Sequence, residues 1–81
     1  MTAYAYVDLD DVPPQLWYSA MKRVDDTSGA TLIAFKGCPL VGQFTSAAHS
    51  QIEFPFPRGF ELRSSLVSWF MHWGIQFRVL M

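Results

Sequence analysis

The last quarter of the chain has apolar residues at helical spacing, then a glycine, then an alternating segment. Serines and charged residues occupy the other side of the helical stretch at residues 61–73. The apolar stripe consists of Leu62, Leu66, Trp69, Phe70 and Trp73. Gly74 can adopt the left-handed conformation that ends a helix, and residues 75–80 alternate like a half-buried strand. The pattern predicts a helix, a stop at Gly74 and a final strand.

The N-terminal part of the chain predicts a strand followed by a helix. Residues 3–9 alternate, with Tyr4 and Tyr6 on the side opposite Ala5 and Val7. Aspartates at 10–11 and prolines at 13–14 form a helix start, because the carboxylates accept from free N–H groups and proline has no N–H there. Apolar residues at 16, 17, 20, 21 and 24 then mark one face of a helix. Basic residues at 22–23 suit its C-terminal end.

The middle of the chain predicts a β-hairpin and then a segment that is harder to place. Residues 30–36 are rich in strand formers, residues 37–39 make a tight connection, and residues 40–45 return as the second arm. Residues 46–58 contain Pro55 and Pro57, which remove backbone donors. We expect an irregular loop there, with a short edge strand as an addition.

The predicted order of elements is strand, helix, strand, strand, helix, strand in one compact domain over residues 1–81. This order suits an α+β fold: a four-stranded antiparallel sheet with two helices on one face, the ferredoxin-like βαββαβ arrangement. A competing interpretation makes residues 46–58 a fifth strand and gives a different α+β meander. The ferredoxin-like interpretation is the one we expect.

Charge and composition narrow the partners and the compartment. The net charge is −1 and the six basic residues are scattered, which disfavours nucleic acid as a partner. The most apolar long segment, residues 62–80, is broken by Arg63, His72 and Arg78, so we expect no membrane span. Cys38 is the single cysteine, and no basic region precedes an apolar run at the N-terminus. These features predict a cytoplasmic protein.

The residues that could perform chemistry form no recognisable motif. The strongest candidate is a Cys38 nucleophile with His72 as base and Asp10 or Asp11 as the orienting carboxylate. No local signature supports this arrangement, and a cysteine beside a proline also packs well as a small apolar residue. The histidines and cysteine lack metal-ligand spacing, and the glycines are isolated. We predict no enzyme activity, no metal site and no cofactor.

Two groups of residues are candidates for binding a partner. The sheet face without helices is expected to carry Tyr4, Tyr6, Gln76 and Arg78. Of these, the two tyrosines and Arg78 resemble base-stacking residues of RNA-binding sheets but suit a protein contact better. The second group is Phe54 and Phe56 in the Phe-Pro-Phe-Pro run, with Arg58 directly after it. Its stiff backbone would lose little entropy on binding, although both rings could equally close the core.

The sequence therefore predicts a small non-enzymatic module that binds another protein by occupying its surface, as inhibitors and adaptors do. The aromatic share of 16% in one small domain supports a contact surface. Phage-encoded inhibitors of host defence, such as anti-CRISPR-type proteins, and bacterial regulators offer an analogy of size and architecture only. The alternative is a homodimeric structural or small-ligand-binding protein that pairs its open sheet faces.

Overall fold

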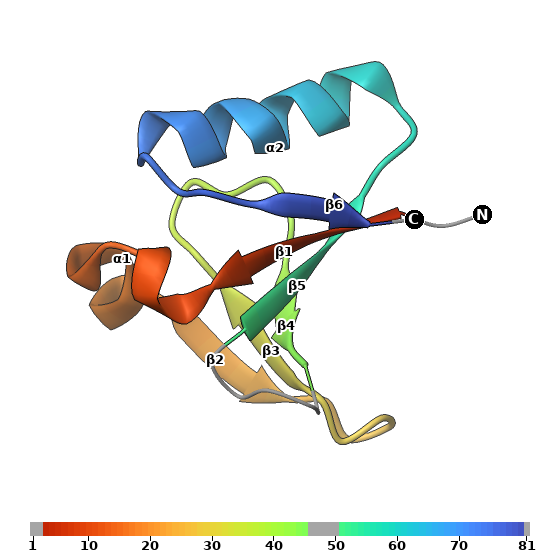
Figure 1. The fold of residues 1–81 in the computed structure, drawn as a ribbon. Helices are drawn as coiled ribbons and strands as arrows, with labels where there is room; N and C mark the ends of the chain where they lie inside the picture. Colours follow the sequence, from red (N-terminus) through yellow and green to blue (C-terminus); the bar gives the residue numbers. More distant parts are fainter. Residues whose placement is uncertain (1–2, 46–50, 81) are drawn as a thin grey trace.

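The described residues, 3–45 and 51–80 of a computed structural model, form an antiparallel sheet with two α-helices (Figure 1). A single 3₁₀ turn at Leu9–Asp11 joins the first strand to the first helix. The elements are β1 (Ala3–Asp8), α1 (Pro14–Ser19), β2 (Met21–Val24), β3 (Thr31–Ala34), β4 (Gly42–Phe44), β5 (Gln51–Phe56), α2 (Phe60–His72) and β6 (Arg78–Leu80). The α+β class predicted from sequence is confirmed.

The sheet has six strands in the order β2-β3-β4-β5-β1-β6, and every neighbouring pair is antiparallel. Strands β2 to β5 follow one another as a meander. Strand β1 then pairs with β5 on one side and with β6 on the other. The predicted four-stranded ferredoxin-like sheet is therefore not confirmed, and its strand count is wrong.

The first source of the difference is the segment 21–24, which is a strand and not the end of a helix. Helix α1 stops at Ser19, whose hydroxyl donates to the carbonyl of Gln15 at 2.9 Å, and Ala20 is extended. A tight turn then folds β2 onto β3: the Asp25 carboxylate accepts from the hydroxyl of Ser28 at 2.7 Å, and Gly29 has φ 75°. Pairing with β3 thus outweighs the helical spacing of residues 16–24.

The second source is residues 51–56, which form the internal strand β5 and not a loop or an edge strand. Pro55 is tolerated inside the sheet because β4 begins at Gly42, and Gln43 is already opposite Glu53. At Pro55, β5 therefore pairs with β1 only, because β4 does not extend that far. Proline has no backbone N–H, but no hydrogen bond to β4 is lost at this position. The competing interpretation, which makes residues 46–58 a further strand, agrees with the structure over residues 51–56. Residues 46–50, including His49, lie outside the described residues.

The core lies between one face of the sheet and the two helices. Ala5 and Val7 of β1 are directly opposite Phe54 and Ile52 of β5, so these side chains share the face that is covered by α2. Trp17 of α1 contacts Phe44, which shares this face, with ring centroids 6.0 Å apart. The buried core consists of Ala5, Val7, Val12, Leu16, Ile33, Phe35, Ile52, Phe54, Leu66, Trp69, Phe70 and Ile75.

Helix α2 follows the sequence prediction in its bounds, but Leu62 of the predicted stripe is 42% exposed and Trp73 is half-buried. Leu66, Trp69 and Phe70 are its buried residues, at the i, i+3 and i+4 positions of one face. Gly74 has φ 67°, and its N–H donates to the Met71 carbonyl while the Ile75 N–H donates to the Phe70 carbonyl. These two bonds are those of a Schellman motif, so the predicted stop at Gly74 is confirmed. The following strand is shorter than predicted and begins only at Arg78.

Candidate functional site

The sheet face turned away from both helices carries a row of side chains that crosses every strand. Residues directly opposite in an antiparallel pair point to the same face, so the pairing register defines the row. We call it the cross-strand row, and the face that carries it the helix-free face. From β2 to β6 it consists of Arg23, Leu32, Gln43, Glu53, Tyr6 and Arg78.

Hydrogen bonds order the middle of this row. The Tyr6 hydroxyl donates to Glu53 Oε2 at 2.9 Å, and Gln43 Nε2 donates to Glu53 Oε1 at 3.3 Å. The pKa of the Tyr6 phenol is raised above 10.0. The largest cause is the hydrogen bond to the Glu53 carboxylate, and desolvation and the charge of that carboxylate act in the same direction. The phenol is therefore a neutral donor at physiological pH, and both Glu53 oxygens are engaged. The row presents a polar centre with little freedom left to lose on binding.

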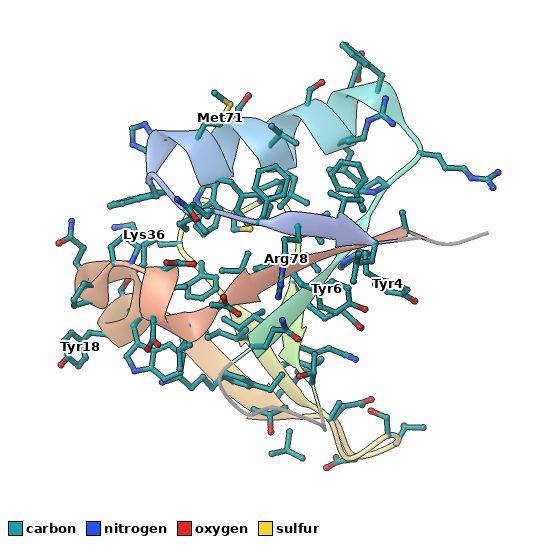
Figure 2. All side chains as sticks on the ribbon, in the orientation of Figure 1. Tyr4, Tyr6, Tyr18, Lys36, Met71 and Arg78 are labelled. Atoms are coloured by element: carbon teal, nitrogen blue, oxygen red, sulfur yellow. The ribbon has the colours of Figure 1, made fainter. Side chains whose placement is uncertain are left out.

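Tyr4 extends the contact area beside the row. It lies opposite Pro55 on one side and Leu80 on the other, so its ring has apolar neighbours on both flanking strands. Arg78 lies 3.9 Å from the Asp8 carboxylate, and both side chains are exposed. Figure 2 shows Tyr4, Tyr6 and Arg78 gathered over β1 and β6, whereas Met71 lies on the outer side of α2. The structure thus brings together three of the residues proposed from sequence.

The second group proposed from sequence is on the opposite face. Because side chains alternate along β5, Phe54 and Phe56 point toward the helices and Pro55 points away from them. Phe54 is fully buried in the core, so it offers no surface to a partner, and the idea of a two-ring contact has to be corrected. Phe56 is half-buried. Arg58 is exposed in the turn between β5 and α2 and is not a member of the cross-strand row.

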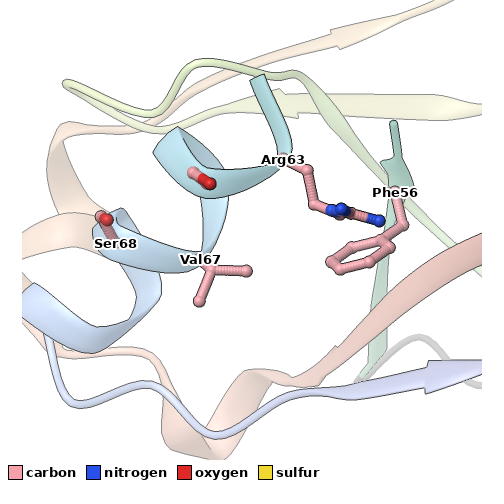
Figure 3. Close-up of a pocket in the computed structure, with 5 residues that line it drawn as sticks. Phe56, Arg63, Val67 and Ser68 are labelled. Atoms are coloured by element: carbon pink, nitrogen blue, oxygen red, sulfur yellow. The ribbon is translucent and has the colours of Figure 1, made fainter. Parts of the chain in front are cut away.

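A shallow pocket of about 430 Å³ lies where Phe56 meets the first half of α2. The Arg63 guanidinium lies over the Phe56 ring, with Cζ 5.9 Å from the centroid, as Figure 3 shows. This cation–π contact accounts for the position of the guanidinium and covers one side of the ring. Phe56 is therefore largely used within the chain.

An apolar hollow of about 400 Å³ lies at the β2 end of the sheet. We call it the edge hollow; it is lined by Met21, Lys22, Arg23, Leu32, Ala34 and Val41. Met21 of β2 is 77% exposed and Val41, directly before β4, is 50% exposed, so both leave apolar surface open to solvent at this hollow. The helix-free face therefore has a polar, aromatic end at β1 and β6 and an apolar end at β2.

The structure gives no support to a Cys38 nucleophile. Burial raises the pKa of the Cys38 thiol, which is opposite to the change that a reactive thiolate requires. His72 is exposed at the end of α2, where its ring contacts Trp73 edge-on with centroids 5.4 Å apart. In the described part of the chain, no group of three or more His, Cys, Asp or Glu side chains could hold a metal ion.

Sequence reasoning missed four members of the row: Arg23, Leu32, Gln43 and Glu53. The sequence predicts the end of a helix at Arg23, and at Glu53 an irregular loop with a short edge strand. A usable signal was present at residues 51–54, where polar Gln51 and Glu53 alternate with apolar Ile52 and Phe54. That period-two pattern is typical of a strand with one polar face.

Comparisons of this chain with models of protein families, with curated proteins and with solved structures find no match. Over residues 3–45 and 51–80, neither helix has the length and apolar character needed to cross a membrane.

Proposed function

We propose that this chain is a small protein-binding module that acts by occupying a surface of another protein, as stoichiometric inhibitors and adaptors do. The observation that supports the proposal is the cross-strand row on a face that neither helix covers. Tyrosine and arginine are enriched at protein interfaces, because they combine a large contact area with polar ends. The Tyr6–Glu53–Gln43 hydrogen bonds hold the centre of the face in place before a partner arrives.

The contact proposed here is centred on Tyr4, Tyr6 and Arg78. The two rings supply apolar area, and the guanidinium near Asp8 is exposed and able to pair with a partner carboxylate. The mechanism is occupation of a surface, with no bond made or broken. The raised pKa of Cys38 agrees with this, since it leaves the thiol protonated at neutral pH.

Replacing both tyrosines, Tyr4→Ser with Tyr6→Ser, is expected to abolish partner capture while the domain stays folded. The measurement is a pull-down from nuclease-treated lysate of the source organism or its host, read by mass spectrometry. The matched control is Tyr18→Ser, because Tyr18 is 84% exposed on α1, away from the row. The control should capture the same protein in the same amount as the unchanged chain.

Equal capture by the double variant and the unchanged chain would refute this surface as the contact, provided that circular dichroism shows the variant to be folded. The alternative function is a homodimer that pairs two helix-free faces. It predicts that the unchanged chain has the solution mass of a dimer and captures no other protein, and that the double variant is a monomer. That pair of results would replace the proposal.

A further inference from the structure

Strand β2 is an edge of the sheet, and the described residues place only β3 beside it (Figure 1). All four of its residues are exposed. An edge strand has backbone N–H and C=O groups that can pair with an added strand. Natural proteins often use a lysine to prevent strand addition at such an edge. A test of this edge therefore has to distinguish whether Lys22 prevents strand addition or attracts an added strand.

The backbone groups of β2 that point outward can be assigned from the adjoining turn. The Asp25 N–H donates to the Ala30 carbonyl at 2.8 Å, so Asp25 faces β3. In an antiparallel pair the inward and outward positions alternate, so the residues two and four positions earlier also face β3. Lys22 and Val24 therefore direct their N–H and C=O groups away from the sheet.

The side chains around this edge combine two positive charges with an apolar surface. Arg23 is on the helix-free face beside the edge hollow, and Lys22 is on the other face with Nζ 3.9 Å from the Trp17 ring centroid. The nearest carboxylate in sequence, Asp25, accepts hydrogen bonds from Ser28 within its own turn. The Ser28 hydrogen bond and, to a lesser extent, the charge of Arg23 lower the pKa of Asp25. Within residues 3–45 and 51–80, however, neither cation forms an ion pair, so both can attract acidic side chains on the two faces of an added strand.

We propose that β2 accepts an extended acidic segment of a partner protein as an added antiparallel strand, with an apolar side chain of that segment in the edge hollow. This inference rests on the proposed function, because it gives the chemistry of a partner at the β2 end of the same face. The pairing is antiparallel, as in every other pair of this sheet.

The register fixes the order of residues in the added strand. One acidic residue lies opposite Arg23 on the helix-free face, and the next lies opposite Lys22 on the other face. The third lies opposite Met21, on the helix-free face again, where an apolar side chain reaches the edge hollow. The preferred segment therefore reads acidic, acidic, apolar in the direction of its chain, and main-chain bonds to Lys22 and Val24 hold it.

A second copy of this chain fits the edge less well. If β2 paired with its own copy about a two-fold axis centred on Lys22 or on Arg23, it would place two like charges directly opposite each other. Such pairs destabilise a sheet. The same charges attract an acidic strand, so charge complementarity selects the acidic segment over the copy.

The test uses a short blocked peptide with Glu-Glu-Ile at its centre and threonines on both sides. Binding is measured by calorimetry, and amide hydrogen exchange is followed by NMR on the full chain. We expect the peptide to bind and to slow exchange at the amides of Lys22 and Val24. Peptides with Lys-Lys-Ile or with the reversed order Ile-Glu-Glu, which has the same composition, should bind at least about tenfold more weakly.

A pair of variants separates the backbone contact from the charge. Lys22→Pro removes an outward N–H and leaves the bonds to β3 in place, whereas Lys22→Ala removes the same charge and keeps the N–H. The proline variant should bind the Glu-Glu-Ile peptide about tenfold more weakly than the alanine variant. If the proline variant is unfolded, hydrogen exchange in the unchanged chain still shows whether the peptide pairs with β2, because pairing slows exchange at the amides of Lys22 and Val24.

Equal binding of the acidic, basic and reversed peptides would overturn the proposal, and so would slowed exchange at sites other than β2. No binding of any peptide would also overturn it and leave Lys22 as a protection against edge pairing. Concentration-dependent self-association that protects the same two amides would replace the acidic segment by a second copy. None of these outcomes alters the Tyr4 and Tyr6 pull-down, so a failure of this inference can be distinguished from a failure of the proposed function.

Discussion

Replacing Phe70 with alanine is expected to lower the free energy of unfolding by about 3–5 kcal/mol. Phe70 is fully buried, and its ring contacts three others: Phe54 at 5.4 Å, Trp69 at 5.7 Å and Phe77 at 4.7 Å between centroids. The variant loses the transfer free energy of the ring and leaves a cavity lined by large rings that collapse poorly. The measurement is urea unfolding followed by circular dichroism.

The control for this prediction is Met71→Ala, the adjacent position on α2. Met71 is 73% exposed, so its truncation should change the free energy of unfolding by less than about 0.5 kcal/mol. A domain of this size has a total stability of only about 4–12 kcal/mol, so the Phe70→Ala variant can be largely unfolded. Phe70→Leu, with a smaller volume loss, then supplies an intermediate value. Equal effects at positions 70 and 71 would contradict the packing described for α2.

The second large effect is expected at Gly42, where the alanine variant should be destabilised by about 1–3 kcal/mol. A Cβ atom at this position would lie 2.7 Å from Cγ2 of Ile52 and 2.9 Å from Cε1 of Phe54. Both neighbours are fully buried on β5, so neither can move without disturbing the core. The same urea titration measures the change.

Gly59→Ala is the matched control for Gly42→Ala. No atom lies within 4 Å of a Cβ built at Gly59, and φ there is −62°. Its alanine variant should differ from the unchanged chain by less than about 1 kcal/mol, since unfolded-state entropy and helix capping act in opposite directions. Full stability of Gly42→Ala would mean that β4 and β5 are not packed in the register described here.

Local patterns were sufficient for the elements that depend on local forces. The helix ending at Gly74 was predicted because spacing and a left-handed glycine specify it within a few residues. The β3–β4 hairpin was predicted with a tight connection at residues 37–39, whereas the connection in the structure runs over residues 35–41. The orientation of Tyr4 and Tyr6 followed from the period of two in β1. These features need no information from distant parts of the chain.

The remaining differences come from tertiary pairing. Residues 21–24 have the spacing of a helix, but the turn at Asp25 brings them beside β3, and they form a strand that pairs with it. The cross-strand row depends on five registers at once, which no single segment encodes. The high aromatic share is also a weaker sign of a contact surface than expected, because four of the aromatic residues, Phe35, Phe54, Trp69 and Phe70, lie in the core.

The most direct test of the helix-free face is photocrosslinking in cells of the source organism or its host. The chain carries benzoylphenylalanine in place of Tyr4 in one sample and in place of Met71 in another, since Met71 lies on the outer side of α2. The proposed function predicts an adduct with one other protein from position 4 and none from position 71. An adduct from position 71 alone, or equal adducts from both positions, would contradict it.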